Sequence, residues 1–289
     1  MKERITITLD SELTGQIDKR IDGNIIKNRS QQIELLLTKA LGVDRPEKAL
    51  ILVGGKGTRL RPITLKIPKC MMDVQEKTVT EYMFDLLKKY GVRDVILSTG
   101  YMKEKVREHY GDGSKFGVDI TYVEENEALG TAGPLKLAKD LLKGSFIVTN
   151  GDELKNINIP RMFRLHKRKN ALVTIALTTV TDPSQYGVAK LSGSRILEFV
   201  EKPKKEESPS NLINAGFYII EPEVIDMIPD GFSMLEKDVF PKLAKQGKLR
   251  GFPFEGQWFD IGNLEKYEIA KKKWTGISAY DDNLYEADE

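Results

Sequence analysis

The chain has 289 residues, 40% of them hydrophobic, which is enough to bury a core in one large domain or two modest ones. Its 45 basic and 43 acidic side chains nearly cancel, so the composition excludes the strong positive field of a general nucleic-acid binder. No apolar run approaches the roughly 18 residues of a membrane-spanning helix, and "MKERITITLD" lacks a signal-peptide core, so we expect a cytoplasmic protein without a membrane partner.

Residues 1–42 are predicted to form a small module of their own. "RITITL", residues 4–9, alternates polar and apolar side chains, which is the period of a half-buried strand. Two amphipathic helices follow: the first is capped by Asp10 or Ser11 and ends at Gly23–Asn24, and the second starts at Ser30. One strand and two helices cannot bury a core alone, and a lone strand leaves both edges unpaired. We therefore expect a homodimer in which the strands of two chains pair.

This module resembles the ribbon–helix–helix family of dimeric DNA-binding proteins, through "KERITITLD" in the ribbon and "KNRS" at the start of the second helix. The resemblance implies that Arg4, Thr6 and Thr8 enter the major groove of operator DNA, and that the amides after Asn28 meet a phosphate. Residues 1–42 contain seven basic and six acidic side chains, which is little charge for neutralising phosphates. Dimerisation without DNA binding therefore remains an alternative.

The pattern changes after "GVDRPEK", where glycine and proline interrupt both periods, and we predict a linker at residues 43–48. From residue 49 onward, short apolar runs alternate with amphipathic helical stretches. This alternation predicts an α/β domain at residues 49–274 with a mostly parallel, Rossmann-like sheet. Residues 275–289 carry five acidic and no basic side chains and are predicted to form a loosely packed tail. The strands expected first are "ALILV" (49–53), "DVILST" (94–99), "VDITYV" (118–123) and "SFIVTN" (145–150), with helices at 79–90 and 131–142.

The first of these strands leads into a glycine-rich, basic loop, "GGKGTRLRP", followed by "PK" at residues 68 and 69. Its spacing fits neither the dinucleotide fingerprint G-x-G-x-x-G nor the P-loop G-x-x-x-x-G-K-[ST]. Glycines at the carboxyl end of a strand still allow backbone N–H groups to approach a phosphate closely, and Arg59 and Lys69 add positive charge. Taken alone, a loop of this kind is more often only a glycine-rich turn with solvated basic side chains.

Seven motifs, in order and rough spacing, resemble those of the sugar-1-phosphate nucleotidyltransferases over residues 48 to about 274. The branch most similar to the chain is mannose-1-phosphate guanylyltransferase, through "ENEALGTAGPLKLA" and "NLINAGFYII". The resemblance implies that an NTP and a sugar 1-phosphate react to an NDP-sugar and pyrophosphate, here GTP and mannose 1-phosphate, with dTDP- or UDP-glucose synthesis as the alternative. The motifs are "GGKGTRLRP…PK", "LGTAGPL" (129–135), "NGD" (150–152), "YGV" (186–188), "EKP" (201–203), "NAG" (214–216) and "WFDIG" (258–262).

The resemblance also assigns roles to residues of these motifs. Asp152 and Asp260 would hold Mg²⁺, which suits two carboxylates from separate strand ends because Mg²⁺ keeps waters and bridges substrate phosphates. Each aspartate also has a structural alternative, in which Asp152 ends a strand in a turn and Asp260 orders the turn before a helix at Asn263. The resemblance implies that Arg59 and Lys69 balance charge on the α-phosphate and pyrophosphate, and that Lys202 binds the sugar phosphate. The triphosphate would be bound by Gly54, Gly55, Gly57 and Thr58, and the base or ribose would lie against Gly130 and Thr131. The sugar would be bound by Gly187, Glu201, Asn214 and Gly216.

Two further points affect the functional hypothesis. Cys70 replaces a proline that is common in the family, and we interpret it as a small packed residue, because no histidine is near it in sequence and the reaction needs no covalent intermediate. A rival hypothesis is a DNA-binding regulator that uses the enzyme-like domain as a sugar-nucleotide sensor. The presence of Lys69, Asp152 and Asp260 favours the enzyme, because a sensor could lose its metal ligands without losing ligand affinity.

Overall fold

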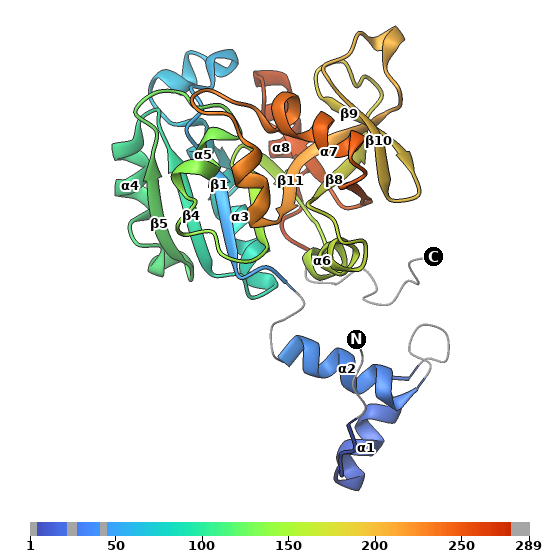
Figure 1. The fold of residues 1–289 in the computed structure, drawn as a ribbon. Helices are drawn as coiled ribbons and strands as arrows, with labels where there is room; N and C mark the ends of the chain where they lie inside the picture. The colour runs from blue at the N-terminus through green and yellow to red at the C-terminus, as the bar shows by residue number, and fades with distance from the viewer. Residues whose placement is uncertain (1–4, 22–27, 41–44, 279–289) are drawn as a thin grey trace. The chain divides into compact units, whose positions relative to one another are not determined.

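The computed structural model describes residues 5–21, 28–40 and 45–278 (Figure 1). The chain divides into two units, residues 1–44 with 280–289 and residues 45–279, which are described separately. Arg4, the predicted helix end at Gly23–Asn24 and all but the first four residues of the predicted acidic tail lie outside the described residues.

The smaller unit contains helices α1 (Ser11–Asp18) and α2 (Arg29–Ala40). The Asp10 side chain caps α1 by accepting the amide of Glu12 at 2.7 Å, as the sequence predicts. An ion pair at 2.6 Å between Arg29 and Asp18 joins the two helices. Residues 5–10 precede α1 without an assigned strand in this single chain, and Ile5 and Ile7 are 75% and 51% exposed. The predicted ribbon therefore has no pairing partner among the described residues.

The larger unit is built on a nine-stranded sheet with the order β5-β4-β1-β6-β11-β8-β12-β10-β9. The first four strands are parallel, as expected for the predicted Rossmann-like sheet. Strand direction changes at β11, which runs antiparallel to both neighbours, so the second half is mixed. The strands are β1 (Lys48–Leu52), β4 (Asp94–Thr99), β5 (Asp119–Glu124), β6 (Phe146–Asn150), β8 (Val173–Thr179), β9 (Gly187–Ser192), β10 (Arg195–Glu201), β11 (Leu212–Ile220) and β12 (Leu249–Pro253).

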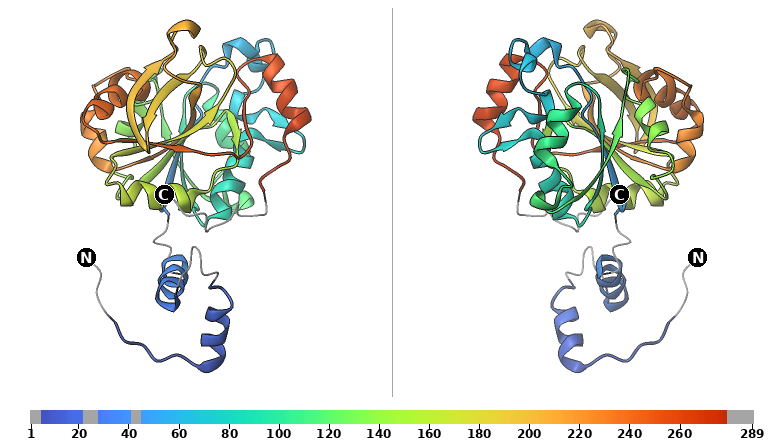
Figure 2. Two further views of the ribbon diagram at one scale, coloured as in Figure 1. Left: turned by 90° about the vertical axis from the view of Figure 1, so that its right-hand side faces the viewer. Right: turned by 90° about the vertical axis from the view of Figure 1, so that its left-hand side faces the viewer.

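Helices cover both faces of this sheet (Figures 1 and 2). Ile51 of β1 packs with α3, α4 and α6, whereas its neighbour Leu50 packs on the opposite face with residues of α5 and α7. This alternation follows from the period of a strand, in which successive side chains point to opposite faces. The larger unit therefore has one buried layer on each side of the sheet. The helices are α3 (Val79–Lys89), α4 (Lys103–Tyr110), α5 (Gly133–Leu137), α6 (Ile159–Arg168), α7 (Phe240–Lys245) and α8 (Leu264–Lys273).

Two short antiparallel pairs complete the larger unit. β2 (Asp73–Val74) pairs with β3 (Lys77–Thr78), and β7 (Glu153–Lys155) pairs with β13 (Trp258–Asp260). A third apolar cluster, which includes Leu60, Leu154 and Trp274, fixes the second pair and α8 against the segment after β1. Of the predicted helix at 131–142, only Gly133–Leu137 forms a regular α-helix, and turns follow it. Within the described part of the chain, no helix is long and apolar enough to cross a membrane.

Candidate active site

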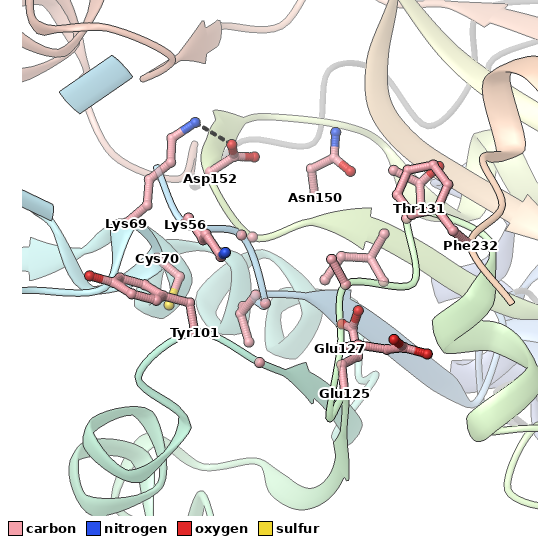
Figure 3. Close-up of a pocket in the computed structure, with 18 of the residues that line it drawn as sticks. Lys56, Lys69, Cys70, Tyr101, Glu125, Glu127, Thr131, Asn150, Asp152 and Phe232 are labelled. Atoms are coloured by element: carbon pink, nitrogen blue, oxygen red, sulfur yellow. Dashed lines mark hydrogen bonds and ion pairs between the residues drawn. The ribbon is translucent and has the colours of Figure 1, made fainter. Parts of the chain in front are cut away.

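A cavity of about 740 Å³ opens at the carboxyl ends of β1 and β6 (Figure 3). After β1 the sheet is extended on one side by β4 and then β5, and the next strand of the sheet, β6, lies on the other side of β1. The strand order therefore reverses between β1 and β6. Open α/β sheets bind ligands at such a reversal, because the loops leaving the two strands diverge there. The cavity is lined by residues 52–56, 69–70, 100–101, 125–128, 130–131 and 150–152, together with Phe232.

The glycine-rich loop forms one wall of the cavity. Gly54, Gly55 and Lys56 line it directly. Gly57 has φ +59°, a left-handed conformation that favours glycine, and starts the tight turn Thr58–Leu60. Thr58 itself is exposed outside the cavity lining. The loop therefore offers the predicted backbone freedom, and it adds the cation of Lys56, for which the motifs imply no role.

Another part of the cavity wall is built by the loop of residues 125–131, whose Glu125 lies against Gly54, and by Phe232. Gly130 has φ +77°, and a Cβ atom there would lie 2.2 Å from the carbonyl oxygen of Ser233. Two backbone hydrogen bonds join the same segments: Ser233 donates to Leu129 at 3.0 Å and Ala132 donates to Ser233 at 3.0 Å. Phe232, next to these hydrogen bonds in the chain, is 65% exposed and lines the cavity (Figure 3).

Two acidic side chains lie on this wall. Glu125 is braced from two sides, because its Oε1 accepts the hydroxyl of Ser98 at 2.8 Å and its Oε2 accepts the amide of Leu129 at 3.2 Å. Glu127 is exposed and also lines the cavity. This end of the cavity therefore presents carboxylate oxygens, which accept hydrogen bonds from a ligand that carries N–H donors.

Lys69 and Asp152 form an ion pair on the cavity wall nearest the glycine loop (Figure 3). Burial disfavours the charged form of Lys69, but the attraction and hydrogen bond of the Asp152 carboxylate outweigh this effect, so the pKa of Lys69 lies above its ordinary value. Burial likewise opposes the charge of Asp152, and the neighbouring Lys69 lowers the pKa of that carboxyl below its ordinary value. Both groups are therefore charged at neutral pH.

Asp260 lies on the strand next to Asp152. Asp260 stands opposite Glu153 in the β7–β13 register, and the amide of Ile261 donates to the carbonyl of Asp152 at 3.4 Å. The carboxylate of Asp260 accepts Lys266 Nζ at 2.8 Å and the hydroxyl of Tyr186 at 3.3 Å. Lys266 belongs to the first turn of α8, so Asp260 also orders the start of that helix, the structural alternative raised above.

Arg59 reaches the same place as Asp260. A Cβ atom at Gly262 would lie 2.8 Å from Asp260 Oδ1 and 3.2 Å from an Arg59 guanidinium nitrogen. Only the absence of a side chain at Gly262 lets these two charged groups flank it. The three motifs that carry Arg59, Asp152 and Asp260 are therefore adjacent in space, although they are separated by up to about two hundred positions in the chain.

The acidic groups of this site fit Mg²⁺ in their chemistry. Among the described residues, no group of three or more His, Cys, Asp or Glu side chains could hold a metal ion. Two carboxylates on adjacent strands suit an ion that takes its remaining ligands from water and from substrate phosphates. Asp152 and Asp260 are the carboxylates that would hold such an ion.

The residues predicted to bind the sugar lie on β9, β10 and β11. Gly187 and Glu201 are register partners, and a Cβ atom at Gly187 would lie 2.9 Å from Glu201 Oε2. Burial raises the pKa of the Glu201 carboxyl. Lys202 follows in a left-handed conformation with φ +50°, which is uncommon for a residue with a side chain and is concentrated at functional sites.

A chain of hydrogen bonds connects this region to the cavity. The hydroxyl of Thr131, in the cavity wall, donates to Glu236 Oε2 at 2.5 Å. Glu236 Oε1 accepts the hydroxyl of Tyr218 at 3.3 Å, and Asn214 donates its amide to that hydroxyl at 2.8 Å. Gly216 donates its backbone amide to Asn214 at 2.9 Å. The base-side and sugar-side motifs therefore belong to one connected network.

A model of the nucleotidyl transferase family matches residues 48–276. The chain belongs to this family. Among its curated relatives, a mannose-1-phosphate guanyltransferase of Yarrowia lipolytica is 42% identical over 226 residues, which are 76% of this chain and 62% of the relative. Mannose-1-phosphate guanyltransferase beta-B of Xenopus laevis is 42% identical with the same coverage. The chain thus spans less than two thirds of the length of these relatives.

Solved structures show the same fold. HddC from Yersinia pseudotuberculosis, crystallised with GMP-PN, is 28% identical, and the match has a TM-score of 0.66 over 78% of this chain and 99% of HddC. A UDP-glucose pyrophosphorylase complexed with UDP-glucose is 24% identical, with a TM-score of 0.69 over 78% of this chain and 97% of that protein. The predicted fold of the larger unit, a nucleotidyltransferase fold, is confirmed.

Proposed function

We propose that this chain transfers a nucleotidyl group from GTP to mannose 1-phosphate and so forms GDP-mannose and pyrophosphate. The observation that carries the proposal is the Lys69–Asp152 ion pair in a glycine-walled cavity, with Asp260 on the adjoining strand. The names of its relatives support the substrate pair. The reaction brings a phosphate dianion to an α-phosphorus that is already surrounded by negative charge, so positioning and charge neutralisation are the main catalytic needs.

The cations of the site meet these needs. Lys69 and Arg59 are assigned to neutralise charge on the α-phosphate and the departing pyrophosphate, and Lys202 is assigned to the sugar phosphate. Asp152 and Asp260 would hold Mg²⁺, which would supply positive charge to offset that of the substrate phosphates. The backbone of Gly54, Gly55, Gly57 and Thr58 is assigned to the triphosphate, which the glycine conformations permit at close range.

The carboxylates of Glu125 and Glu127 support guanine as the base. Guanine carries two adjacent donors, N1–H and the N2 amino group, which a carboxylate accepts together. Uracil and thymine present one N–H flanked by two carbonyl oxygens, which a carboxylate repels. Gly130 and Thr131 are assigned to the base or ribose, and the exposed ring of Phe232 provides a surface on which a base can stack.

The sugar is assigned to Gly187, Glu201, Asn214 and Gly216. Glu201 and Asn214 supply carboxylate and amide groups for the ring hydroxyls, and Gly187 allows the chain to approach Glu201 closely. Tyr186, which directly precedes Gly187, connects this set to Asp260 by a hydrogen bond at 3.3 Å.

The proposal is tested by pyrophosphate release from five NTPs, each combined with mannose, glucose and N-acetylglucosamine 1-phosphates. We expect the highest kcat/KM for GTP with mannose 1-phosphate, and no release without Mg²⁺. A preference for another base or sugar would correct the substrate pair. The absence of release from every pair would favour the rival hypothesis of a sugar-nucleotide sensor.

For residues 1–42 we propose a ribbon–helix–helix dimer that binds operator DNA. The exposure of Ile5 and Ile7 in a segment without assigned secondary structure supports pairing with a second copy, because exposed apolar side chains favour association. Thr6 and Thr8 alternate with these isoleucines and are exposed as well. Sedimentation of the full chain is expected to show a dimer, and a monomer at micromolar concentration would contradict this part of the proposal.

A further inference from the structure

Lys155, the last residue of β7, has a fully buried side chain that none of the functional assignments above uses. Its ammonium donates to Glu153 Oε2 at 2.9 Å, to the carbonyl oxygens of Ala215 and Gly216 at 2.8 and 3.0 Å, and to the hydroxyl of Thr149 at 3.3 Å. Burying a charge without such partners is costly, so these contacts fix the position of Lys155 closely.

Glu153 extends the network to two further segments. Its Oε2 also accepts the indole N–H of Trp258 at 2.9 Å, and its Oε1 accepts the side-chain amide of Asn150 at 2.8 Å. Glu153 and Lys155 are two positions apart on β7, so they share one face, and Leu154 packs on the other in the cluster around Trp274.

Gly216 lies so close to Glu153 that there is no room for a side chain at this position. It has φ +59°, and a Cβ atom there would lie 2.5 Å from Glu153 Oε1 and 2.4 Å from the amide nitrogen of Asn150. The ion pair is therefore enclosed on every side by the segments that it joins.

Each of these segments carries a residue assigned to the reaction. Asp152 directly precedes Glu153, Asp260 lies two residues after Trp258, and Asn214 lies two residues before Gly216. Apart from Asn150, the members of the network lie outside the cavity lining. Lys155 and Glu153, with side chains 0% and 10% exposed, can act on a substrate only through the neighbours that they hold.

We propose that Lys155 and Glu153 form a buried positioning pair, which sets the relative placement of Asp152, Asp260 and the Asn214–Gly216 segment for nucleotidyl transfer. This inference rests on the function proposed above. A pair that served stability alone would be replaceable by uncharged groups without a change in turnover. A positioning pair would not be replaceable in this way.

The test compares three variants of the full chain. Lys155→Met removes the cation and leaves Glu153 buried and unpaired, so it combines instability with loss of position. The double variant Glu153→Gln/Lys155→Met removes both charges, which restores much of the stability while the hydrogen bonds to Ala215 and Gly216 remain lost. His166→Gln is the control, because His166 is another fully buried polar side chain, bonded to Thr174 and Glu221 at the opposite end of the sheet.

Urea unfolding, kcat and the half-saturating Mg²⁺ concentration are measured for each variant. We expect the double variant to unfold close to the His166→Gln control but to lose about 10- to 100-fold in kcat or in apparent Mg²⁺ affinity, the usual effect of removing residues that orient a metal site. Calorimetric titration of GTP with Mg²⁺ gives a second readout that does not depend on turnover.

Two results would separate the hypotheses. A double variant with wild-type kcat and wild-type Mg²⁺ dependence would overturn the positioning role and leave the pair a stability element. A wild-type protein that releases no pyrophosphate would instead overturn the proposed function. In that case a change in calorimetric Mg²⁺–GTP affinity in the double variant would still support the positioning of this site.

Discussion

The carbonyl of Asp152, the residue before β7, accepts the backbone amide that directly follows Asp260 at the end of β13, so the backbones of these two aspartates, 108 positions apart, are neighbours. If β7 and β13 lay on different faces of the molecule, Asp152 and Asp260 could not bind the same ion. In this structure the two backbones are adjacent, and the charges of both aspartates act on Lys69.

The first prediction concerns these carboxylates. Asp152→Asn keeps the size of the side chain but removes its charge, so we expect pyrophosphate release to fall by about a thousandfold or more while the fold is retained. Asp260→Asn is expected to act in the same direction and also to weaken the start of α8, because Lys266 loses its charged partner. Circular dichroism provides the control for folding. Unchanged turnover of Asp152→Asn would contradict the metal assignment.

The second prediction concerns Phe232 as a surface for the base. Stacking of a base on an aromatic ring contributes about 1–3 kcal/mol, so Phe232→Ala should raise the KM for GTP by about tenfold. The kcat and the KM for mannose 1-phosphate should change little. Leu197→Ala, at a 47% exposed apolar side chain on β10, is the matched control. An equal rise in KM for both substrates would show that the ring acts elsewhere.

The third prediction concerns acid stability and Glu221, at the end of β11. Burial opposes ionisation of this carboxyl, but hydrogen bonds with His166, Lys167 and Ser145 outweigh it and lower its pKa from 4.5 to about 2. A lowered pKa stabilises the fold above about pH 4.5, and this contribution is lost as the pH falls towards 2.

Glu221→Gln should therefore lower the free energy of unfolding at pH 7 by about 1–2 kcal/mol, once the full linkage is discounted for solvent screening. Near pH 2 the variant and the wild type should be nearly equal. Urea unfolding at both pH values measures the difference. A loss of the same size at pH 2 would show that the contribution of Glu221 does not depend on its charge.

The fourth prediction concerns Cys70. The thiol is 3% exposed, and burial raises its pKa to about 12. At pH 8 only about one thiol in 10⁴ is ionised, and the thiolate is the nucleophile. Iodoacetamide should therefore label the native protein about a hundredfold more slowly than the urea-unfolded protein, as followed by intact mass. Equal rates would mean that this part of the cavity wall opens readily.

The fifth prediction concerns the N-terminal module. Arg4→Ala should weaken specific DNA binding by about 1–3 kcal/mol, the usual value of a good base contact, while turnover stays unchanged. A gel-shift titration at moderate salt provides the measurement. If the native protein shows no sequence-specific shift, only the dimerisation role remains.

Much of the larger unit can be predicted from the sequence, because its elements are long and strongly periodic. The run 94–99 is β4 with the same bounds, and the apolar spacing from Val79 onward gives α3 to within one residue. β7 and β13 could not be predicted. Each has three residues, and each depends on a partner more than a hundred positions away.

The site shows the same division. Motif order identifies Lys69, Asp152 and the glycine loop, which the structure brings to one cavity. The exposure of Phe232 was not predictable, because an aromatic residue in sequence indicates a core position as readily as a cavity wall. Lys155 was missed for the opposite reason: a lysine in a short polar stretch indicates a solvated side chain. Only the carbonyl oxygens around it show otherwise.

The burial of Cys70 has a practical consequence, since it is the only cysteine in the chain. A second cysteine introduced at Phe232 would be the preferred target of a maleimide dye, without removal of the native one. The emission of such a conjugate would report ligand entry and departure in real time. The enclosed native thiol thus makes the wild-type background suitable for fluorescence kinetics.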